Sequence, residues 1–306
     1  MEETDKTIGI LGGMGPEATV DLFGKIVRST PARVDQDHVR VVIDNNPKIP
    51  DRTAFLRGQG PDPVPAMQAG IAGLVRMGAD LILIPCNTAH VYYDRLQAAS
   101  PVPILHIMRE VARALAGSGR RTGGVPRRVG LLATELTVES GLYHQALGEV
   151  GIEVLVPAPE FQRLVTEAIF GPEGIKAGVY GPARARLLRA GQHLVERGAQ
   201  ALIAGCTELP LVLRPGDFAV PWIDPTEILA RAALRRVLGP GRILPDACPW
   251  GAGEQGPAAG ATAAPGAGGA GGPAPAATPA TAGGRAAPVA SRGAVRGPGA
   301  AAAAGE

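Results

Sequence analysis

Short runs of apolar residues alternate along the chain with longer stretches in which apolar residues recur every three or four positions. A continuous apolar run of this kind is typical of a strand covered on both faces, and the periodic stretches are typical of amphipathic helices. The pattern therefore predicts an α/β fold with mainly parallel sheets. Strands are predicted at Ile8–Leu11, Val39–Ile43, Leu81–Ile84, Val129–Ala133, Gly151–Val156, Ala201–Gly205 and Ala219–Asp224.

The pattern occurs twice. GADLILIPCNTAH at Gly78–His90 corresponds to GAQALIAGCTELP at Gly198–Pro210, and each follows a helical stretch and runs through a strand to a cysteine. The glycine in the opening strand of each half precedes that cysteine by nearly the same distance, 77 residues from Gly9 and 76 from Gly130. Two motifs with matched spacing indicate an internal duplication. We therefore expect two pseudo-symmetric α/β domains with the active site in the cleft between them.

The domain boundaries follow from breaks in this pattern. Residues 117–128, rich in Gly and Arg, are the predicted first crossover, and the helix predicted at Pro225–Val237 is expected to return to the first domain. The first domain is then residues 1–117 plus 218–245, and the second is residues 128–217. Residues 246–306 are predicted to be a disordered tail, because residues 251–306 contain 22 Ala, 15 Gly and 7 Pro and no Leu, Ile, Met or aromatic residue.

Charge and composition exclude several classes of function. The formal net charge is only +2, so no basic field favours nucleic acid or an anionic membrane. The apolar runs are far shorter than the roughly 20 residues that span a bilayer, and the acidic residues 1–7 lack the basic start of a secretory signal. Three cysteines form no disulfide framework and no zinc motif, so no metal site is predicted. We expect a cytoplasmic protein.

Two cysteines stand at the predicted carboxyl ends of strands, where open α/β sheets bind their ligands. Cys86 leads into Asn87 and Thr88, and Cys206 leads into Thr207. A thiol at a helix N-terminus meets free N–H groups that favour the thiolate and that also hold a carboxylate. Free cysteines are more often buried and inert, but a pair at equivalent places favours acid–base chemistry on one shared ligand.

Other candidate residues have an ordinary structural alternative. GGMGPEAT at Gly12–Thr19 formally fits a dinucleotide fingerprint, but a tight turn close to a small ligand is preferred. Arg52 can pair with a carboxylate or lie on the surface. Lys176 is one of four lysines in an arginine-rich chain, and is a ligand anchor or a solvated residue. His90 tunes Cys86 or is structural. Glu208 orients Cys206 or caps its helix.

Six motifs together resemble the aspartate/glutamate racemase family, in particular its aspartate racemase or broad-specificity amino-acid racemase branch. The motifs are GGMGPEAT, NNPKIPDRT at Asn45–Thr53, PCNTAH at Pro85–His90, ATELTVESGLY at Ala133–Tyr143, IKAG at Ile175–Gly178 and GCTELP at Gly205–Pro210. They span nearly all of residues 8–240. The resemblance implies a cofactor-independent homodimeric racemase that acts on a small acidic amino acid such as aspartate or glutamate.

By motif position, the resemblance implies that Cys86 and Cys206 are the acid–base pair, with Cys86 acting on the D enantiomer. The substrate's α-carboxylate and amino group would be held by Asn87, Thr88, Thr137 and Thr207, and Met14 would be a further substrate-binding residue. Arg52 and Lys176 would hold the side-chain carboxylate. Leu136 stands where the family usually has Gly, and puts the role of Thr137 in question.

Related activities stay open. A decarboxylase needs one cysteine only, and a hydantoin racemase needs no anchor for a side-chain carboxylate. A maleate isomerase shares the fold. A protein that only binds acidic amino acids would catalyse no exchange of the α-proton.

Overall fold

A computed structural model of the chain describes residues 6–118 and 124–239, all within one structural unit, Met1–Gly256. The predicted tail at residues 246–306, the centre of the first crossover and Cys248 lie outside the described residues. Among the helices that are described, none has the length and apolar character needed to span a bilayer.

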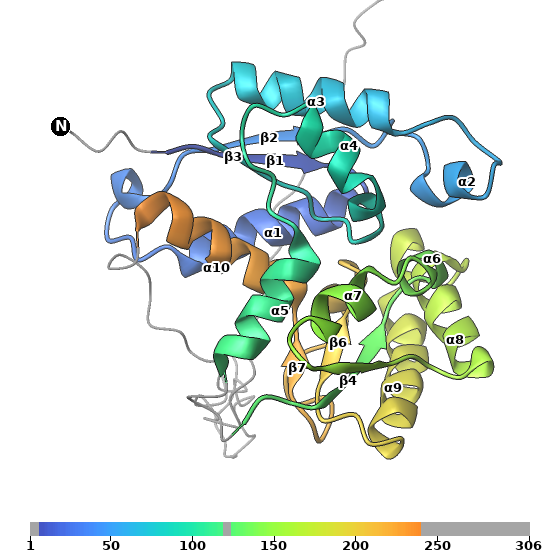
Figure 1. Cartoon of the computed structure of the whole chain (residues 1–306). Coiled ribbons are helices and arrows are strands. Elements are labelled where there is room, and N and C mark those ends of the chain that lie inside the picture. The colour runs from blue at the N-terminus through green and yellow to red at the C-terminus, as the bar shows by residue number, and fades with distance from the viewer. Residues whose placement is uncertain (1–5, 119–123, 240–306) are drawn as a thin grey trace, which may run out of the picture. The chain divides into compact units, whose positions relative to one another are not determined.

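The first sheet is parallel, with its earliest strand at the centre. β1 (Ile8–Gly12) pairs with β2 (Val41–Asn45) on one side and with β3 (Leu81–Leu83) on the other, in the order β2-β1-β3. Figure 1 shows α3 over one face of this sheet and α1 and α10 on the other. The helices that follow these strands are α1 (Pro16–Ser29), η1 (Asp35–Asp37), α2 (Arg52–Leu56), α3 (Val64–Arg76), η2 (Thr88–Tyr92), α4 (Tyr93–Ala98) and α5 (Ile107–Ser118).

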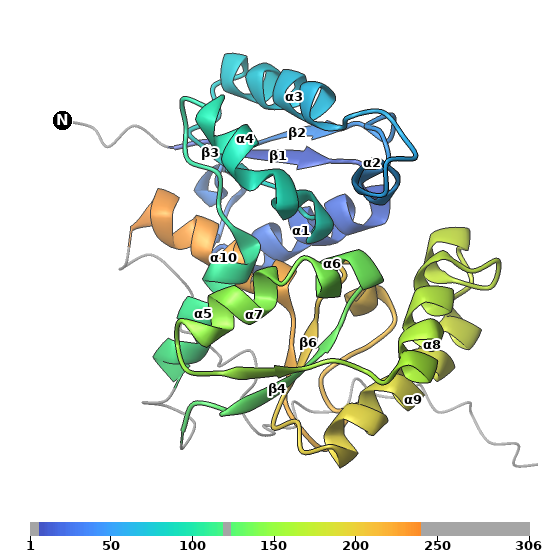
Figure 2. The ribbon, with the colours of Figure 1, turned by 45° about the vertical axis from the view of Figure 1, so that its right-hand side comes forward.

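The second sheet repeats this arrangement and adds one strand. β4 (Arg128–Leu132) lies between β5 (Glu153–Leu155) and β6 (Leu202–Ala204), and β7 (Trp222–Ile223) pairs with β6, all in parallel. In Figure 2, α7 and the pair α8 and α9 cover opposite faces of this sheet. Its helices are α6 (Glu135–Glu139), α7 (Leu142–Gly148), α8 (Pro159–Phe170), η3 (Ile175–Ala177), α9 (Tyr180–Glu196), η4 (Leu209–Leu211) and α10 (Pro225–Leu238). The predicted α/β class with parallel sheets is confirmed.

The duplication extends to individual contacts. A Cβ added to Gly9 would lie 2.7 Å from Ile82 and 3.4 Å from Leu74, and a Cβ added to Gly130 would lie 2.6 Å from Leu202 and 3.0 Å from Leu194. These are the same positions of the two repeats, so in each half only glycine lets the helix that leads into the cysteine-bearing loop's strand, α3 or α9, pack directly on the central strand. Gly78 and Gly198, which end those helices, share a φ of 91°.

The helix α10 follows the last strand of the second sheet and packs against α1 and α5 of the first half. One apolar core includes strand residues of both halves, among them Ile10 and Leu131, with Leu229 of α10. The expected return of the last helix to the first half is therefore seen in its contacts. The exact domain boundaries stay a prediction.

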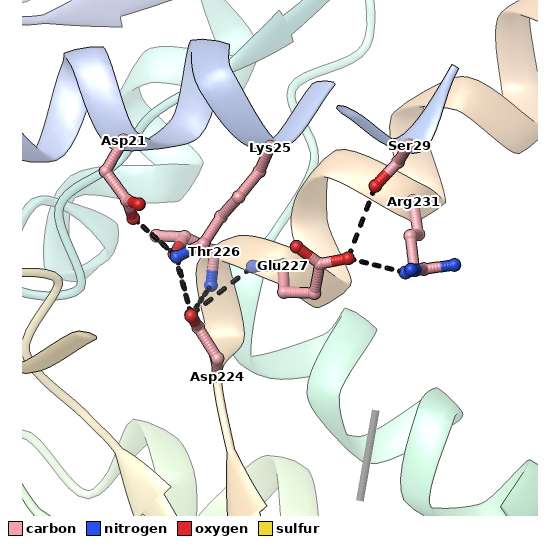
Figure 3. Close-up of polar contacts among 7 residues, drawn as sticks. All are labelled: Asp21, Lys25, Ser29, Asp224, Thr226, Glu227 and Arg231. Atoms are coloured by element: carbon pink, nitrogen blue, oxygen red, sulfur yellow. Dashed lines mark hydrogen bonds and ion pairs between the residues drawn. The ribbon is translucent and has the colours of Figure 1, made fainter. Parts of the chain in front are cut away.

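A buried lysine of the first half holds the start of α10 in place. Lys25 of α1 donates hydrogen bonds to Asp21, to Asp224 and to the Thr226 hydroxyl (Figure 3). Asp224 also accepts from the backbone N–H groups of Thr226 and Glu227, and so caps the N-terminus of α10. The Lys25 ammonium thereby stabilises the carboxylate that begins α10.

Candidate active site

Both cysteines line one small cavity, which we call the two-cysteine cavity. Its volume is about 40 Å³, room for a few water molecules at most, so the groups in its walls lie in a water-poor environment. Met14, Cys86 and Cys206 each follow a strand end, after β1, β3 and β6 respectively. The lining residues are Met14, Asp51, Arg52, Thr53, Cys86, Asn87, Thr88, Thr134, Phe170, Lys176, Gly205, Cys206, Thr207 and Glu208.

Two hydrogen bonds hold the backbone of Cys86 in place. Its N–H donates to the Ile84 carbonyl at 2.8 Å, and its own carbonyl lies 2.9 Å from His90 Nδ1. The Cys86 carbonyl can only accept, so Nδ1 of the neutral ring carries the proton and donates it, while Nε2 accepts from the Ile107 N–H. Burial lowers the pKa of His90 and keeps it neutral. His90 is thus a satisfied buried histidine that positions the Cys86 backbone.

The pKa of the Cys206 thiol is strongly raised. Burial, and next the negative charge of Glu208, raise its pKa to about 12, although a backbone hydrogen bond from Glu208 opposes the rise. Position beside a helix start led us to expect a thiolate. The helix that follows, η4 (Leu209–Leu211), is a single short turn, so its dipole is too small to offset burial beside a carboxylate. Cys206 is therefore a thiol at neutral pH in this structure.

Lys176 and Glu208 form an ion pair in the wall of the two-cysteine cavity. The distance from Lys176 Nζ to Glu208 Oε1 is 2.7 Å, and the Glu208 side chain is only 4% exposed. Burial acts to lower the pKa of Lys176, but the charge and hydrogen bond of Glu208 outweigh it and raise the pKa. The Glu208 side chain makes no capping bond to η4, so the capping alternative for this residue is wrong.

Arg52 brings a positive charge to the same cavity from the first half. Its guanidinium donates to the backbone carbonyls of Pro50, Ile49 and Met14. Arg52 Nε is buried and has no hydrogen-bond partner. Since an unsatisfied buried donor is costly, this N–H is suited to an anionic ligand.

Asn87 presents a second unused donor. Its Oδ1 accepts from the Tyr143 hydroxyl of α7 at 2.9 Å, while its Nδ2 is buried without a partner. Burial raises the pKa of Tyr143 well above its usual value, so this phenol stays a hydrogen-bond donor. The bond from Tyr143 fixes the amide so that its NH₂ group is the free end.

Three threonines form a hydrogen-bonded group across the two halves. The Thr88 hydroxyl lies 3.0 Å from that of Thr137 and 3.4 Å from that of Thr134, which is 2.9 Å from Thr137. Thr134, the N-cap of α6, lines the two-cysteine cavity, whereas Thr137 is buried behind it. The family resemblance named Thr137 as a substrate contact, while in this structure Thr134 occupies the cavity wall. Leu136 is also buried.

The remaining predicted residues also line the cavity. Thr207 donates its hydroxyl to the Pro85 carbonyl of the other half at 3.1 Å, which joins the two cysteine loops. Met14 is buried at the turn between β1 and α1. Eight of the nine named site residues therefore share one cavity, and Thr137 lies directly behind it.

Several lining residues were not predicted. Thr134 could have been predicted as the N-cap of α6, because an N-cap threonine accepts a hydrogen bond from the backbone N–H three residues later, here that of Thr137. The Lys176 ammonium lies over the Phe170 ring, with Nζ 6.0 Å from the ring centre, and nothing in the local sequence indicates this cation–π contact. No group of three or more His, Cys, Asp or Glu side chains suited to a metal ion occurs within residues 6–118 and 124–239.

Comparison with known proteins agrees with this arrangement. Residues 11–233 match the family model of Asp/Glu/hydantoin racemases. The chain belongs to this family. Cys86 and Cys206, which follow β3 and β6, both lie inside the matched range.

Individual relatives cover most of the described residues. The broad-specificity amino-acid racemase RacX of Bacillus subtilis is 30% identical over 238 residues, which are 76% of this chain and 98% of that protein. An aspartate racemase structure from Picrophilus torridus is 33% identical with a TM-score of 0.67, over 76% of this chain and 94% of that one. An aspartate racemase homologue from Pyrococcus horikoshii OT3 is 27% identical with a TM-score of 0.60, over 76% and 99%.

Proposed function

We propose that this protein is a cofactor-independent amino-acid racemase in which Cys86 and Cys206 exchange protons with the two faces of the substrate's α-carbon. The observation that carries the proposal is that equivalent strand ends of the duplicated fold bring both cysteines to one cavity. Inversion at carbon requires a proton to leave one face and another to arrive on the opposite face. Two thiols meet this need without either moving around the substrate.

The reaction requires a defined protonation state of the two cysteines before substrate binds. One sulfur must be a thiolate and the other a thiol, and after each turnover the two have exchanged protonation states while the substrate is inverted. Cys206 is the thiol of the resting enzyme, since its pKa is about 12. Cys86 is then the first base, and in the reverse direction Cys206 is the base. We assign Cys86 to the D enantiomer.

The unpaired donors in the cavity support binding of an amino acid. The α-carbanion gains stability when its carboxylate accepts hydrogen bonds from groups already in place. Asn87 Nδ2 is such a donor, and Arg52 Nε is a second buried donor without a partner. The substrate's α-carboxylate would satisfy Asn87, and a side-chain carboxylate would satisfy Arg52. The threonine hydroxyls of Thr88 and Thr134 line the same wall.

Two cationic side chains in the cavity and the named relatives support a proposal for the substrate class. Arg52 and Lys176 both line the two-cysteine cavity and can contact an acidic side chain, so we propose aspartate or glutamate among the substrates. The relative named as an aspartate racemase supports an acidic substrate, and the relative named for broad specificity supports a wider range of amino acids. We further propose that the protein acts in the cytoplasm, where both thiols stay reduced, and that it is a homodimer.

Chiral chromatography tests the reaction directly. Purified protein is incubated with single enantiomers of aspartate, glutamate and other amino acids in D₂O, and the products are analysed for configuration and for deuterium at the α-carbon. We expect inversion accompanied by one deuterium per turnover. A protein that only binds its ligand would give neither, and a decarboxylase would give a shorter amine or acid.

Single cysteine variants test the two-thiol mechanism. Cys86→Ala and Cys206→Ala should each abolish interconversion in both directions. Cys206→Ala should still exchange the α-proton of the D enantiomer through Cys86, and Cys86→Ala that of the L enantiomer. Cys248→Ala, the same change at the third cysteine, is the control that should racemise normally. Near wild-type racemisation by either active-site variant would refute the mechanism.

A further inference from the structure

The ion pair between Lys176 and Glu208 contributes to the charge of the two-cysteine cavity. Both residues line that cavity, and their charged atoms are 2.7 Å apart. The Glu208 carboxylate is almost fully buried, whereas the Lys176 side chain remains 32% exposed. A buried carboxylate so close to the ammonium cancels most of its field within the cavity.

The pair is also fixed in place by the opposite half of the protein. A Cβ added to Gly15, in the turn between β1 and α1, would lie 2.6 Å from Glu208 Oε1 and 3.1 Å from Lys176 Nζ. The backbone of the first half therefore closes directly on the ion pair of the second half. With a buried carboxylate beneath it and a backbone wall beside it, the Lys176 ammonium has little freedom to leave Glu208.

Arg52 is the cavity's other cation, and its bonds go to backbone carbonyls. Lys176 and Glu208 together contribute no net charge, and the positive charge of Arg52 is matched by Asp51, which also lines the cavity. A zwitterionic amino acid carries an α-carboxylate and an α-ammonium group whose charges cancel. The charged side chains of the lining therefore leave no excess positive charge that requires a second carboxylate on the substrate's side chain.

We propose that Glu208 is a specificity-determining residue, which neutralises Lys176 so that the site admits amino acids with uncharged as well as acidic side chains. The inference rests on the proposed racemase function and names its substrate range. If Glu208 did not screen Lys176, the ammonium would attract a side-chain carboxylate and would be left unpaired beside a neutral one.

The test compares aspartate with asparagine, which have nearly the same shape and differ in side-chain charge. The measured quantity is kcat/KM for L-aspartate divided by kcat/KM for L-asparagine. The enzymes are wild type, Glu208→Gln, Lys176→Gln and the double variant. These variants give the pair a net charge of 0, +1, −1 and 0 respectively.

The expected ratio follows the net charge of the pair. Relative to wild type, Glu208→Gln should raise it about ten-fold or more and Lys176→Gln should lower it about as much, the size expected for gaining or losing one close charge interaction. The double variant should return to within about three-fold of wild type, within the usual error of additivity. Effects of Glu208 on the reactivity of Cys206 change both rates alike and cancel in the ratio.

Each outcome bears on the proposal. An unchanged or lowered ratio in Glu208→Gln overturns it, as does a double variant that follows either single variant, because a purely structural role of the pair would not track charge. If wild type exchanges the α-proton of neither amino acid, the proposed function fails. The same ratio is then read from dissociation constants by calorimetry, and failure to bind either amino acid overturns the specificity inference too.

Discussion

Lys25 and Asp224 form a largely buried ion pair with their charged atoms 2.5 Å apart, although they are 199 positions apart in the sequence. Lys25 lies on α1 of the first half, and Asp224 lies where the chain leaves β7 of the second sheet and begins α10 (Figure 3). The pair stabilises the segment between β7 and α10, where the chain passes from the second half back to the first.

Replacing Lys25 should therefore destabilise the fold strongly. Lys25→Met leaves the carboxylates of Asp21 and Asp224 close together without their shared cation, and we expect the free energy of unfolding to fall by about 3–5 kcal/mol. Urea denaturation followed by circular dichroism measures the change. Lys6→Met, on an exposed lysine, is the matched control and should change stability by at most about 0.5 kcal/mol.

A second variant separates lost charge from lost packing. Asn caps helices as well as Asp does, so Asp224→Asn keeps the cap on α10 while removing one buried charge. The double variant Lys25→Met/Asp224→Asn should lose less stability than Lys25→Met alone. An equal or larger loss would show that the lysine's contribution is not electrostatic.

Adding one methyl group at Gly15 should impair the site. The new Cβ would meet the ion pair of Glu208 and Lys176 at 2.6 and 3.1 Å, and shifts of about 1 Å at such groups can lower kcat/KM by about a hundred-fold. The measurement is steady-state racemisation of aspartate by Gly15→Ala. Gly148→Ala, where an added Cβ meets nothing within 4 Å, should keep its activity. Full activity of Gly15→Ala would mean that the pair is free to move.

The Cys206 thiol should resist alkylation. With a pKa of about 12, only about one molecule in ten thousand carries the thiolate at pH 8, so iodoacetamide should label it slowly, and faster as the pH rises. Peptide mapping by mass spectrometry follows each cysteine separately. Glu208→Gln removes the second cause of the raised pKa and should accelerate labelling. Fast labelling of Cys206 in wild type at pH 7 would contradict the assignment of this residue as the resting thiol.

Two buried histidines should make the fold sensitive to acid. Burial lowers the pKa of His90, and burial followed by the charge of His90 lowers that of His106 to about 3. Below about pH 6.5 the unfolded chain takes up protons on these residues that the folded protein does not, so stability falls as the pH falls. Between pH 7 and 5 we expect His106 to account for a loss of about 2 kcal/mol in urea unfolding, and His90 to add to that loss.

The variant His106→Phe isolates one of these contributions. It keeps an aromatic ring beside Tyr93, whose ring centre is 4.7 Å from that of His106, and removes the titrating nitrogen atoms. Its stability should therefore decline less steeply between pH 7 and 5 than that of wild type. The same slope in both proteins would exclude His106 as a source of the acid sensitivity.

Local pattern was enough to predict the repeated unit. Continuous apolar runs gave the parallel strands, and the glycines that end α3 and α9 marked where each helix stops, because these signals act between near neighbours in the chain. The matched distances from Gly9 to Cys86 and from Gly130 to Cys206 placed both thiols at strand ends. The family match then confirmed the kind of protein.

The sequence alone determined that two cysteines occupy equivalent positions of a duplicated α/β fold. Only the tertiary structure decided that Thr134 rather than Thr137 reaches the cavity wall, that Glu208 pairs with Lys176, and that the Cys206 thiol is hard to ionise. These outcomes depend on burial and on charges contributed by segments far apart in the chain. Periodicity and motif spacing carry no information about which side chains meet or how much water surrounds them.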